Sequence, residues 1–337
     1  MLSYDSIFFG YMVKFLVIRF SSIGDIVLTT PVFRLIKNQI ENSQVHFLTK
    51  GENVSIINNN PNIDKIHTLN YKNSNELINE LSSEQFDYII DLHNNIRTAK
   101  IKKQLRIISF TFKKLNIEKW LLVNFRYNRL PDIHIVDRYI NTLNAFGLKN
   151  DKKGLDYFID DKDKYDINNL FLNNNKTISL VIGAKHFTKQ IPTELIINIC
   201  NLVNYNIILL GGKEDYQKSI EIADNTNNII NKVGSININQ SASIISQSDL
   251  VITSDTGLMH IASAFNKSII SIWGNTIPEF GMYPYLPDNT SIIIQNKELK
   301  CRPCSKIGFN KCPKKHFKCM KDLNIQEIID SIHSILK

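Results

Sequence analysis

Acidic, hydroxyl and basic side chains recur in this sequence directly after runs of apolar residues. The first case is SSIGD (21–25), which follows the apolar run KFLVIRF and ends on the lone acid Asp25. Small residues such as Gly24 let the backbone approach a ligand closely, and free N–H groups at a helix start favour negative charge. We therefore interpret Ser21, Ser22, Gly24 and Asp25 as a candidate anion or sugar-phosphate site. The alternative is that Asp25 only caps a helix.

A second junction of this kind is VITSDTGLMHIASAF (251–265), where an apolar run ends at Asp255. Thr256 and Gly257 then open a helix that carries His260. Such a helix start offers N–H groups and a hydroxyl to phosphates, with Asp255 and His260 as polar anchors. An N-capped core helix with an incidental histidine is the alternative. The next loop, SIWGNTIPEFGMYPY, is rich in aromatic residues, Pro and Gly, which is typical of a ligand-lining loop.

Two further junctions complete the set. IGAKHFTKQIPTE (182–194) places Lys185, His186, Thr188 and Lys189 after a strand, and LLGGKEDY (209–216) places Glu214 after Gly211 and Gly212. A lysine neutralises a diphosphate as a point charge, and a carboxylate accepts hydrogen bonds from ribose hydroxyls. Either segment could instead be an ordinary solvated loop. Three junctions in the second half of the chain predict a nucleotide diphosphate site in a C-terminal domain.

The elements that would position these residues are strands alternating with helices. The first half predicts strands over 14–20, 44–50, 65–69 and 86–93, with helical segments over 31–40, 53–58 and 75–83. The second half predicts strands over 177–184, 206–212, 229–233, 250–255 and 268–274, with helices over 193–203, 216–226, 239–249 and 257–265. This alternation favours two doubly wound parallel sheets, joined near residues 150–175, with a ligand between the halves at the carboxyl ends of the strands. A final amphipathic helix over 324–337 should pack on the surface of one domain.

Length and composition agree with a two-domain globular protein. The chain has 337 residues, of which 43% are hydrophobic, and a formal net charge of +8. No apolar run reaches the roughly 18 to 20 residues of a spanning helix, and no signal peptide is recognisable, so we expect a soluble protein. Residues 1–13 are expected to form a disordered extension, and Met12 could be the true start in place of Met1. The positive charge favours a polyanionic partner, which could be nucleic acid, a nucleotide or an acidic lipid.

Two further features concern the later part of each half. The stretch from Arg97 to Arg129 contains ten basic residues and one acid, Glu118, interleaved with apolar residues such as Trp120. Such a patch suits an anionic membrane surface or a phosphorylated lipid, and the alternative is a solvated helical face.

Four of the five cysteines lie close together in the sequence, at Cys301, Cys304, Cys312 and Cys319. The first pair has zinc-ligand spacing and the second pair is too widely separated for a usual zinc knuckle, so reduced structural thiols are favoured over a zinc site.

The motifs RFSSIGDIVLTTP, T-K-Q-x-P-x-E ending at Glu194, and SDTGLMHIASAF with SIWGNTIPEFGMYPY resemble bacterial glycosyltransferase family 9. This family contains the heptosyltransferases of lipopolysaccharide core assembly. The resemblance extends over nearly the whole chain from about Lys14. It implies an α/β fold of the GT-B type, with two Rossmann-like domains facing a central cleft. The acceptor domain would be residues 14–165, and the nucleotide-sugar domain would be residues 166–337.

The resemblance also implies roles for individual residues. Asp25 matches the catalytic base of an inverting transfer that needs no metal, and Ser21, Ser22 and Gly24 would line the acceptor side. Lys189, beside Thr188, matches the lysine that contacts donor phosphate, and Glu214 matches the acid tied to the donor ribose, less securely because local spacing varies. The diphosphate would be held by the junction of Asp255, Thr256, Gly257 and His260. A single carboxylate within reach of the acceptor hydroxyl suffices for such an inverting transfer.

The expected reaction moves a heptose, or a related sugar, from an ADP-sugar to a lipopolysaccharide inner-core or lipid A-type acceptor. We expect no cofactor beyond the nucleotide-sugar co-substrate, no metal and no nucleic acid partner. The protein should be a monomer that associates peripherally with the cytoplasmic face of the inner membrane. Two alternatives stay open: a nucleotide-sugar epimerase or synthase with the same two-domain fold, and a basic nucleotide- or nucleic-acid-binding protein without catalysis.

Overall fold

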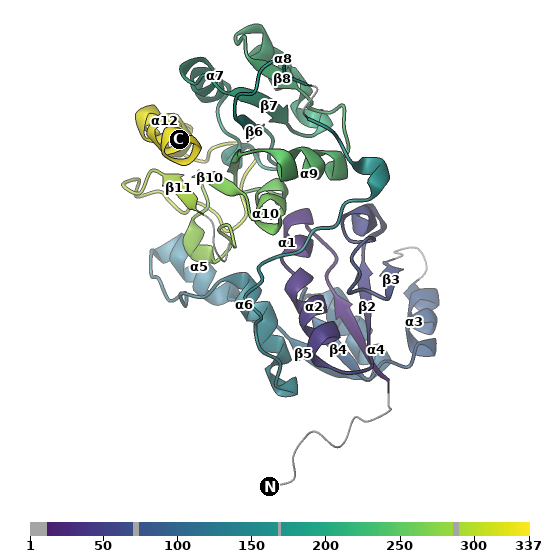
Figure 1. Cartoon of the computed structure of the whole chain (residues 1–337). Helices are drawn as coiled ribbons and strands as arrows, with labels where there is room; N and C mark the ends of the chain where they lie inside the picture. The colour runs from purple at the N-terminus through teal and green to yellow at the C-terminus, as the bar shows by residue number, and fades with distance from the viewer. Residues whose placement is uncertain (1–11, 70–73, 168–169, 286–289) are drawn as a thin grey trace. The chain divides into compact units, whose positions relative to one another are not determined.

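The computed structural model describes residues 12–69, 74–167, 170–285 and 290–337. It divides into two compact units: residues 1–114 with 135–158, and residues 115–134 with 159–337 (Figure 1). These units differ from the predicted division at 165/166 in two respects: the boundary lies at 158/159, and the segment 115–134 belongs to the second unit. There Arg126 donates hydrogen bonds to the backbone oxygens of Lys300 (3.1 Å) and Pro303 (2.8 Å). Of the predicted extension over residues 1–13, residues 1–11 lie outside the described part of the chain.

The first unit contains a parallel sheet of five strands in the order β3-β2-β1-β4-β5. The strands are β1 (Val13–Ile18), β2 (Ser43–Thr49), β3 (Lys65–Thr68), β4 (Tyr88–Asp91) and β5 (Ile108–Thr111). The four strands predicted in this half are confirmed. The fifth, β5, was not predicted, because it lies inside the basic stretch over 97–129, although IISFTF (107–112) is rich in residues that favour strands.

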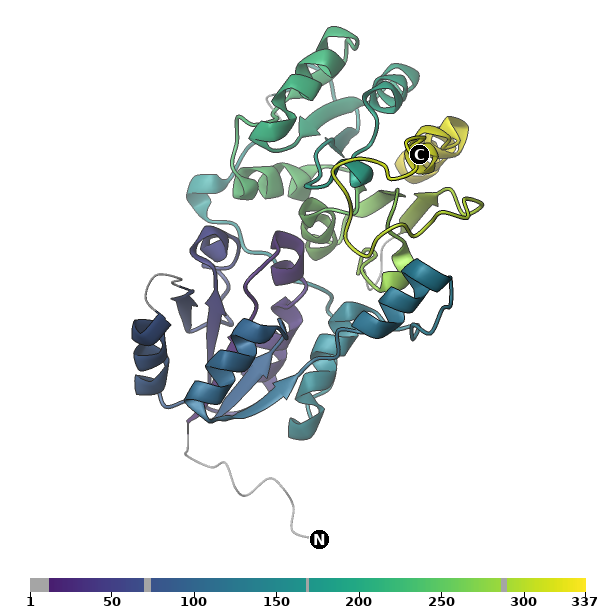
Figure 2. The same cartoon turned by 180° about the vertical axis from the view of Figure 1, so that it is seen from behind.

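Helices cover both faces of this sheet. They are α1 (Ile23–Val27), α2 (Thr30–Gln39), α3 (Ser74–Ser83), α4 (Ile96–Leu105) and α6 (Ile135–Ile140), with the 3₁₀ helices η2 (Gly51–Ile56) and η3 (Asn141–Phe146). Alternate residues of β1 point to opposite faces. Leu16 and Ile18 join a core cluster with Ile101 of α4, whereas Phe33 of α2 packs on Phe47 with ring centroids 5.1 Å apart. Accordingly α2 lies in front of the sheet in Figure 1 and α4 lies in front of it in Figure 2.

The second unit contains a parallel sheet of six strands in the order β11-β10-β9-β6-β7-β8. The strands are β6 (Thr177–Val181), β7 (Asn206–Leu210), β8 (Ile229–Asn231), β9 (Leu250–Ser254), β10 (Ser268–Trp273) and β11 (Ser291–Gln295). The five predicted strands are confirmed, and β11 is an addition at the edge. The order reverses at β6 and β9, which is the arrangement of a doubly wound sheet with a ligand site at the switch point.

Helices again cover both faces. They are α5 (Asn116–Phe125), α7 (Thr193–Leu202), α8 (Tyr216–Asp224), α9 (Ile238–Gln247), α10 (Gly257–Ala264), α11 (Lys318–Lys321) and α12 (Ile325–Leu336), with the 3₁₀ helices η4 (Asp161–Asp163), η5 (Phe187–Lys189), η6 (Lys213–Asp215) and η7 (Pro278–Phe280). The predicted C-terminal helix is confirmed as α12. It packs against α7 and β10 and buries Ile328 and Ile332. In the described ranges no helix is long and apolar enough to cross a membrane.

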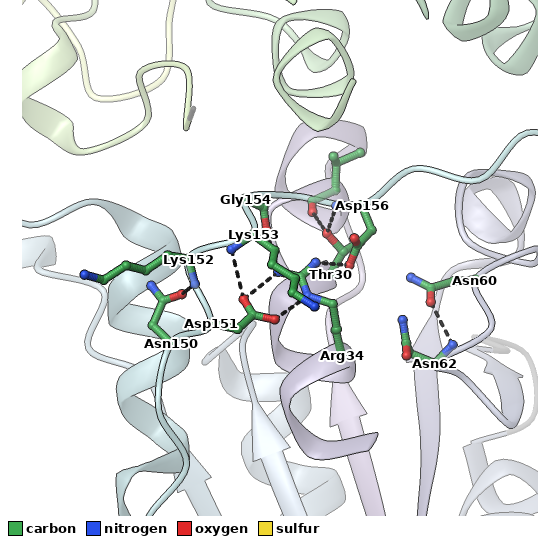
Figure 3. A network of polar contacts seen from close by, with 11 residues as sticks. Thr30, Arg34, Asn60, Asn62, Asn150, Asp151, Lys152, Lys153, Gly154 and Asp156 are labelled. Atoms are coloured by element: carbon green, nitrogen blue, oxygen red, sulfur yellow. Dashed lines mark hydrogen bonds and ion pairs between the residues drawn. The ribbon is translucent and has the colours of Figure 1, made fainter. Parts of the chain in front are cut away.

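A buried arginine ties the end of the first unit to its helix α2. Arg34 donates to both oxygens of Asp151, with Nε–Oδ2 at 2.8 Å and Nη2–Oδ1 at 3.0 Å, and also contacts the carboxylate of Asp156 (Figure 3). Burial pushes the pKa of both carboxyls upward. At Asp151 the hydrogen bonds from Arg34 and from the backbone of Lys153, together with the charges of both residues, outweigh burial, and the pKa is lowered. At Asp156 burial outweighs Arg34, and the pKa is raised. This network fixes residues 150–156 against α2.

Candidate functional site

The predicted acid turn follows β1, the central strand of the first unit. The chain leaves β1 after Ile18 and enters the short helix α1 at Ile23, so Asp25 lies in the first turn of that helix. Its Oδ2 accepts hydrogen bonds from the backbone N–H (3.0 Å) and hydroxyl (2.7 Å) of Ser22. The helix-capping interpretation of Asp25 is therefore correct as far as it goes.

The other oxygen of Asp25 has a partner that the sequence did not indicate. Arg19 Nη2 lies 2.7 Å from Asp25 Oδ1. Arg19 is only 7% exposed and also donates to Ser21 O (2.8 Å), Leu92 O (2.6 Å) and the hydroxyl of Tyr139 (3.0 Å). Burial would lower the pKa of Arg19, but the charge of Asp25 and the hydrogen bond to it hold that pKa above its usual value.

This arrangement does more than cap a helix. Arg19 and Ser22 together contact both oxygens, so the carboxylate is held in one orientation. Asp25 is half-buried, and the neighbouring Ser22 is exposed.

A histidine near this turn was not singled out from the sequence. His93 follows β4, the neighbour of β1 in the sheet, and its ring centroid lies 4.7 Å from that of Phe20. Burial, and then the charge of Arg19, lower the pKa of His93 to about 4, so the ring is neutral at pH 7. Its Nδ1 is buried without a hydrogen-bond partner in the described part of the chain. A neutral imidazole nitrogen in this position can exchange a hydrogen bond with a sugar hydroxyl.

Three residues of the second unit meet at the carboxyl ends of adjacent strands. Lys189 follows β6, Asp255 follows β9 and Thr276 follows β10, and these strands are neighbours in the sheet. Asp255 Oδ2 accepts from Lys189 Nζ at 2.5 Å and from the Thr276 hydroxyl at 2.9 Å. The structure thus brings together two of the predicted donor-site residues. Thr276 was not named individually, although it lies in the loop over 271–285 that the sequence predicted to line a ligand.

Thr188, the neighbour of Lys189, is engaged by the protein itself. Its side chain is buried, and its hydroxyl donates to Phe309 O (3.2 Å) and accepts from Phe309 N (2.8 Å). Thr188 therefore fixes the backbone that carries Lys189, and its hydroxyl does not point to solvent. The sequence predicted a polar contact for the Thr188 hydroxyl but could not show that the partner is the backbone of Phe309.

The junction after β9 starts helix α10 as expected. Thr256 is the N-cap residue and Gly257 the first helical residue, so the free N–H groups of α10 begin beside Asp255. The hydroxyl of Thr256 lies 3.1 Å from that of Thr253. His260 is 2% exposed and lies on the buried side of α10. The helix start can receive an anion, whereas His260 is part of the interior of the unit.

Glu214 lies exposed in η6, after the two glycines that end β7. Its carboxylate folds over Gly212, where a Cβ would meet Glu214 Oε2 at 2.4 Å. The next acid, Asp215, is buried and accepts from Gly212 N at 2.9 Å. The two acids of this loop therefore differ in role: Asp215 stabilises the turn, and Glu214 is available to a ligand.

Two buried polar side chains next to Asp255 and Thr276 have no hydrogen-bond partner among the described residues. Asn275, which precedes Thr276, is 1% exposed, and neither its Oδ1 nor its Nδ2 forms a hydrogen bond in the described ranges. The hydroxyl of Ser254, the last residue of β9, is likewise without a partner there. Buried polar groups are rarely unsatisfied in native proteins, so each such group requires an explanation. A ligand at the ends of β9 and β10 would supply one.

The cysteine-rich segment consists of free thiols. Cys301 Sγ lies 3.9 Å from His316 Nε2, and Cys312 Sγ accepts from Phe317 N at 3.4 Å. Burial and neighbouring thiols raise the pKa of Cys304 to about 11, and burial raises that of Cys319 to about 12. The thiols of Cys304 and Cys319 are therefore protonated at neutral pH. The choice between structural thiols and a zinc site stays a prediction.

The basic stretch over 97–129 is shared between the two units. In the first unit Lys102 pairs with Asp91 at 2.8 Å. In the second unit α5 exposes Ile117 and Trp120, and Phe125 at its end packs its ring against Trp120 with centroids 5.2 Å apart. The stretch is therefore not part of one unit, and its role on the acceptor side stays a prediction.

Residues 75–312 match the family model for glycosyltransferase family 9 (heptosyltransferase). The chain belongs to this family. A curated relative, lipooligosaccharide heptosyltransferase 2 of Campylobacter jejuni, is 26% identical over 336 residues, which cover 94% of this chain and 96% of the relative. The protein is thus a glycosyltransferase, as the sequence motifs predicted.

Solved structures agree on the fold. A family 9 glycosyltransferase from Veillonella parvula superposes with a TM-score of 0.78 at 20% identity, covering 96% of this chain and 97% of the other. The Escherichia coli ADP-heptose lipopolysaccharide heptosyltransferase II superposes with a TM-score of 0.72 at 18% identity, covering 96% and 98%. The predicted GT-B fold, with two Rossmann-like domains, is confirmed.

Proposed function

We propose that this protein transfers a heptose from ADP-heptose to a lipopolysaccharide inner-core or lipid A-type acceptor, with inversion at the anomeric carbon and without a metal ion. The observation that carries the proposal is the fixed carboxylate of Asp25, held by Arg19 at 2.7 Å and by Ser22. The name of the Escherichia coli relative supports ADP-heptose as donor and lipopolysaccharide as acceptor class.

In this reaction Asp25 takes the proton of the acceptor hydroxyl as its oxygen attacks the anomeric carbon. The new C–O bond forms on the face opposite the ADP, and the bond from the anomeric carbon to the phosphate oxygen breaks, with its electron pair leaving on ADP. One base in hydrogen-bond reach of the hydroxyl is sufficient for this displacement. His93, neutral at pH 7, is suited to hold another hydroxyl of the acceptor.

On the donor side, the leaving diphosphate requires positive charge and hydrogen-bond donors. Lys189 and the N–H groups at the start of α10 supply them in the second unit. In the structure Lys189 is paired with Asp255, so the proposal requires that the phosphates share or replace that carboxylate as the partner of Lys189. The unsatisfied side chains of Asn275 and Ser254 would gain partners from the same ligand. Glu214 is proposed to hold the ribose.

The acceptor lipid also implies contact with a membrane. Helix α5 exposes Ile117 (72%) and Trp120 (52%), and Phe125 and Tyr127 extend this exposed surface beyond the helix end. Aromatic and aliphatic side chains next to basic residues such as Arg129 are suited to the interface of an anionic bilayer. We propose that α5 is the peripheral membrane contact, on the cytoplasmic side.

The experiment that tests the function combines purified protein, ADP-heptose and a Kdo-lipid A acceptor. The expected result is a product heavier by one heptose, formed at an undiminished rate after chelation of metal ions. Transfer from a different nucleotide sugar would refute the donor. Hydrolysis or epimerisation of the donor without any acceptor, or salt-dependent DNA or RNA binding without turnover, would refute the class of function.

The membrane contact has its own test. Vesicles with anionic lipid should pull down the wild-type protein, and Ile117→Ser with Trp120→Ser should lose most of this binding while transfer to a detergent-solubilised acceptor is kept. Leu202→Ser is the matched control, because Leu202 is also exposed (58%) but lies on α7. Equal loss of binding in the control would refute a role specific to α5.

A further inference from the structure

A compact group of metal-ligand side chains lies in the first unit, away from the acid turn. His46 comes from β2, His67 from the edge strand β3, and Glu84 follows the end of α3. One ligand atom from each lies within 4.8 Å of the others. Both histidines are almost fully buried, whereas the side chain of Glu84 is 16% exposed. The group therefore lies just beneath the surface.

The sheet register explains why the two histidines meet. Leu48 pairs with His67 across β2 and β3, and His46 lies two residues before Leu48, so both imidazoles project from the same face. Helix α3 covers this face through Leu77 and Leu81. The sequence analysis did not single out these histidines, because 20 intervening residues separate them and the pairing appears only once β2 and β3 are in register.

The hydrogen bonds fix the tautomer of one ring. His67 Nδ1 contacts the carboxylate of Glu80, so this nitrogen carries the proton and donates it. His67 Nε2 then presents a lone pair toward His46 Nδ1, 3.0 Å away. An imidazole oriented in this way by a carboxylate is the usual arrangement of a metal-binding histidine.

Glu84, the third residue of the group, is not joined to the two histidines by a hydrogen bond. Glu84 Oε2 lies 3.9 Å from His46 Nδ1, too far for a hydrogen bond. Ligand atoms of a tetrahedral zinc ion, at bond lengths of about 2.0–2.1 Å, are about 3.3 Å from one another. Two of the separations, 3.0 and 3.9 Å, bracket this value, and all three lie within 4.8 Å. Small side-chain shifts would bring the three atoms to one ion.

We propose that His46, His67 and Glu84 bind a divalent transition-metal ion, with zinc the best match to two imidazole nitrogens and one carboxylate oxygen. Water would complete the coordination on the exposed side of Glu84. Glu80 positions His67 and does not touch the ion, and Lys65, which pairs with the other oxygen of Glu84 at 2.5 Å, holds that carboxylate in place. The ion would join two strands and the end of α3, so its role is to stabilise the first unit and it takes no part in sugar transfer.

The test uses the tag-free full-length chain, depleted with a chelator and then titrated with Zn²⁺ and Co²⁺. We expect one tightly bound ion per chain, a higher thermal midpoint with Zn²⁺, and a Co²⁺ spectrum without the intense near-ultraviolet charge-transfer band that thiolate ligands produce. This spectrum separates the site from the cysteine-rich segment. A folded wild-type chain that binds neither ion would overturn the proposal.

Variants locate the ion. His67→Gln and Glu84→Gln should abolish stoichiometric binding, and Glu80→Gln should weaken it by roughly 10- to 100-fold. His333→Gln, which removes an exposed histidine on α12, and Cys312→Ser should bind as the wild type does. Circular dichroism of each apo variant checks folding, and Glu84→Gln serves where His67→Gln fails to fold. Binding retained in Glu84→Gln but lost in Cys312→Ser would place the ion elsewhere and refute the assignment.

Discussion

Replacing Asp25 by Asn removes the proposed base, but the structure predicts a second effect that must be separated from the first. Loss of a general base lowers turnover by about 10²- to 10⁴-fold, which corresponds to about 3–5 kcal/mol of activation free energy. The same change leaves Arg19, which is 7% exposed, without its carboxylate partner. Breaking a buried ion pair costs up to about 3–5 kcal/mol of folding free energy.

The folding cost should fall below that upper value. Arg19 keeps three neutral acceptors, at Ser21 O, Leu92 O and the hydroxyl of Tyr139. What is lost is one charge-assisted hydrogen bond, worth about 1.5–3 kcal/mol. Against a typical folding free energy of about 5–15 kcal/mol, Asp25→Asn should still be folded at 25 °C. Its thermal midpoint should fall, its donor affinity should be kept, and its turnover should be lost.

The chain offers a matched control for the folding effect. Asp151 pairs with Arg34, and the side-chain exposures of that pair, 17% and 8%, nearly equal those of Asp25 and Arg19, 16% and 9%. Because Arg34 keeps the carboxylate of Asp156, Asp151→Asn should lower the thermal midpoint by no more than Asp25→Asn does, while turnover stays near that of the wild type. The assays are thermal unfolding, donor binding by calorimetry and single-turnover sugar transfer.

A double variant supplies the decisive comparison. Arg19→Met with Asp25→Asn removes both charges, so it should recover much of the stability that Asp25→Asn loses. Turnover should stay as low as in Asp25→Asn, because no base has been restored. If turnover returns together with stability, Asp25 serves to hold Arg19 in place and the reasoning that makes it the base is wrong.

Three further predictions concern the second unit. Lys189→Ala should weaken donor binding by about 10- to 100-fold, as expected for a charged hydrogen bond, and calorimetry should show no such change for the exposed Lys185→Ala. Asn275→Leu should weaken donor binding without lowering the thermal midpoint, because the buried amide forms no hydrogen bond with any residue that the structure describes. Gly183→Ala should destabilise the unit by about 1–3 kcal/mol in denaturant unfolding, since its Cβ would lie 1.9 Å from Asp215 Oδ2.

The functional residues at strand ends could be predicted, because the residue types change sharply where each strand ends. Apolar runs, followed by small residues and then an acid, placed Asp25 and Asp255 at junctions without knowledge of the strand order. The fold followed from the same alternation of elements. What the sequence did not reveal was β5, an edge strand within the basic stretch over 97–129. Nor did it reveal that this stretch is divided between two units.

Partners that depend on strand register could not be predicted in the same way. In the sequence Arg19 is only a residue near the end of a predicted strand. The structure shows that its buried side chain pairs with Asp25 and donates to the hydroxyl of Tyr139. His93 acquires its environment from β1, a strand more than 70 residues earlier, through the β1–β4 pairing. A sequence shows which side chains could do chemistry, whereas their protonation is set by neighbours that the topology supplies.

The Lys189–Asp255 pair shows how this distinction bears on function. The sequence assigns both residues to one donor site, and a reader of the sequence alone would count a free lysine for the phosphates. In the structure the ammonium already has a carboxylate partner, Asp255, and the hydroxyl of Thr276 donates to the same carboxylate oxygen, Oδ2. Donor binding is then an exchange of partners, in which the phosphates compete with Asp255 for one charge. The free energy of donor binding then contains only the difference between the Lys189–phosphate and Lys189–Asp255 ion pairs. Donor affinity should therefore depend less steeply on salt concentration than it would if Lys189 were unpaired, because Asp255 already neutralises its charge before the donor binds.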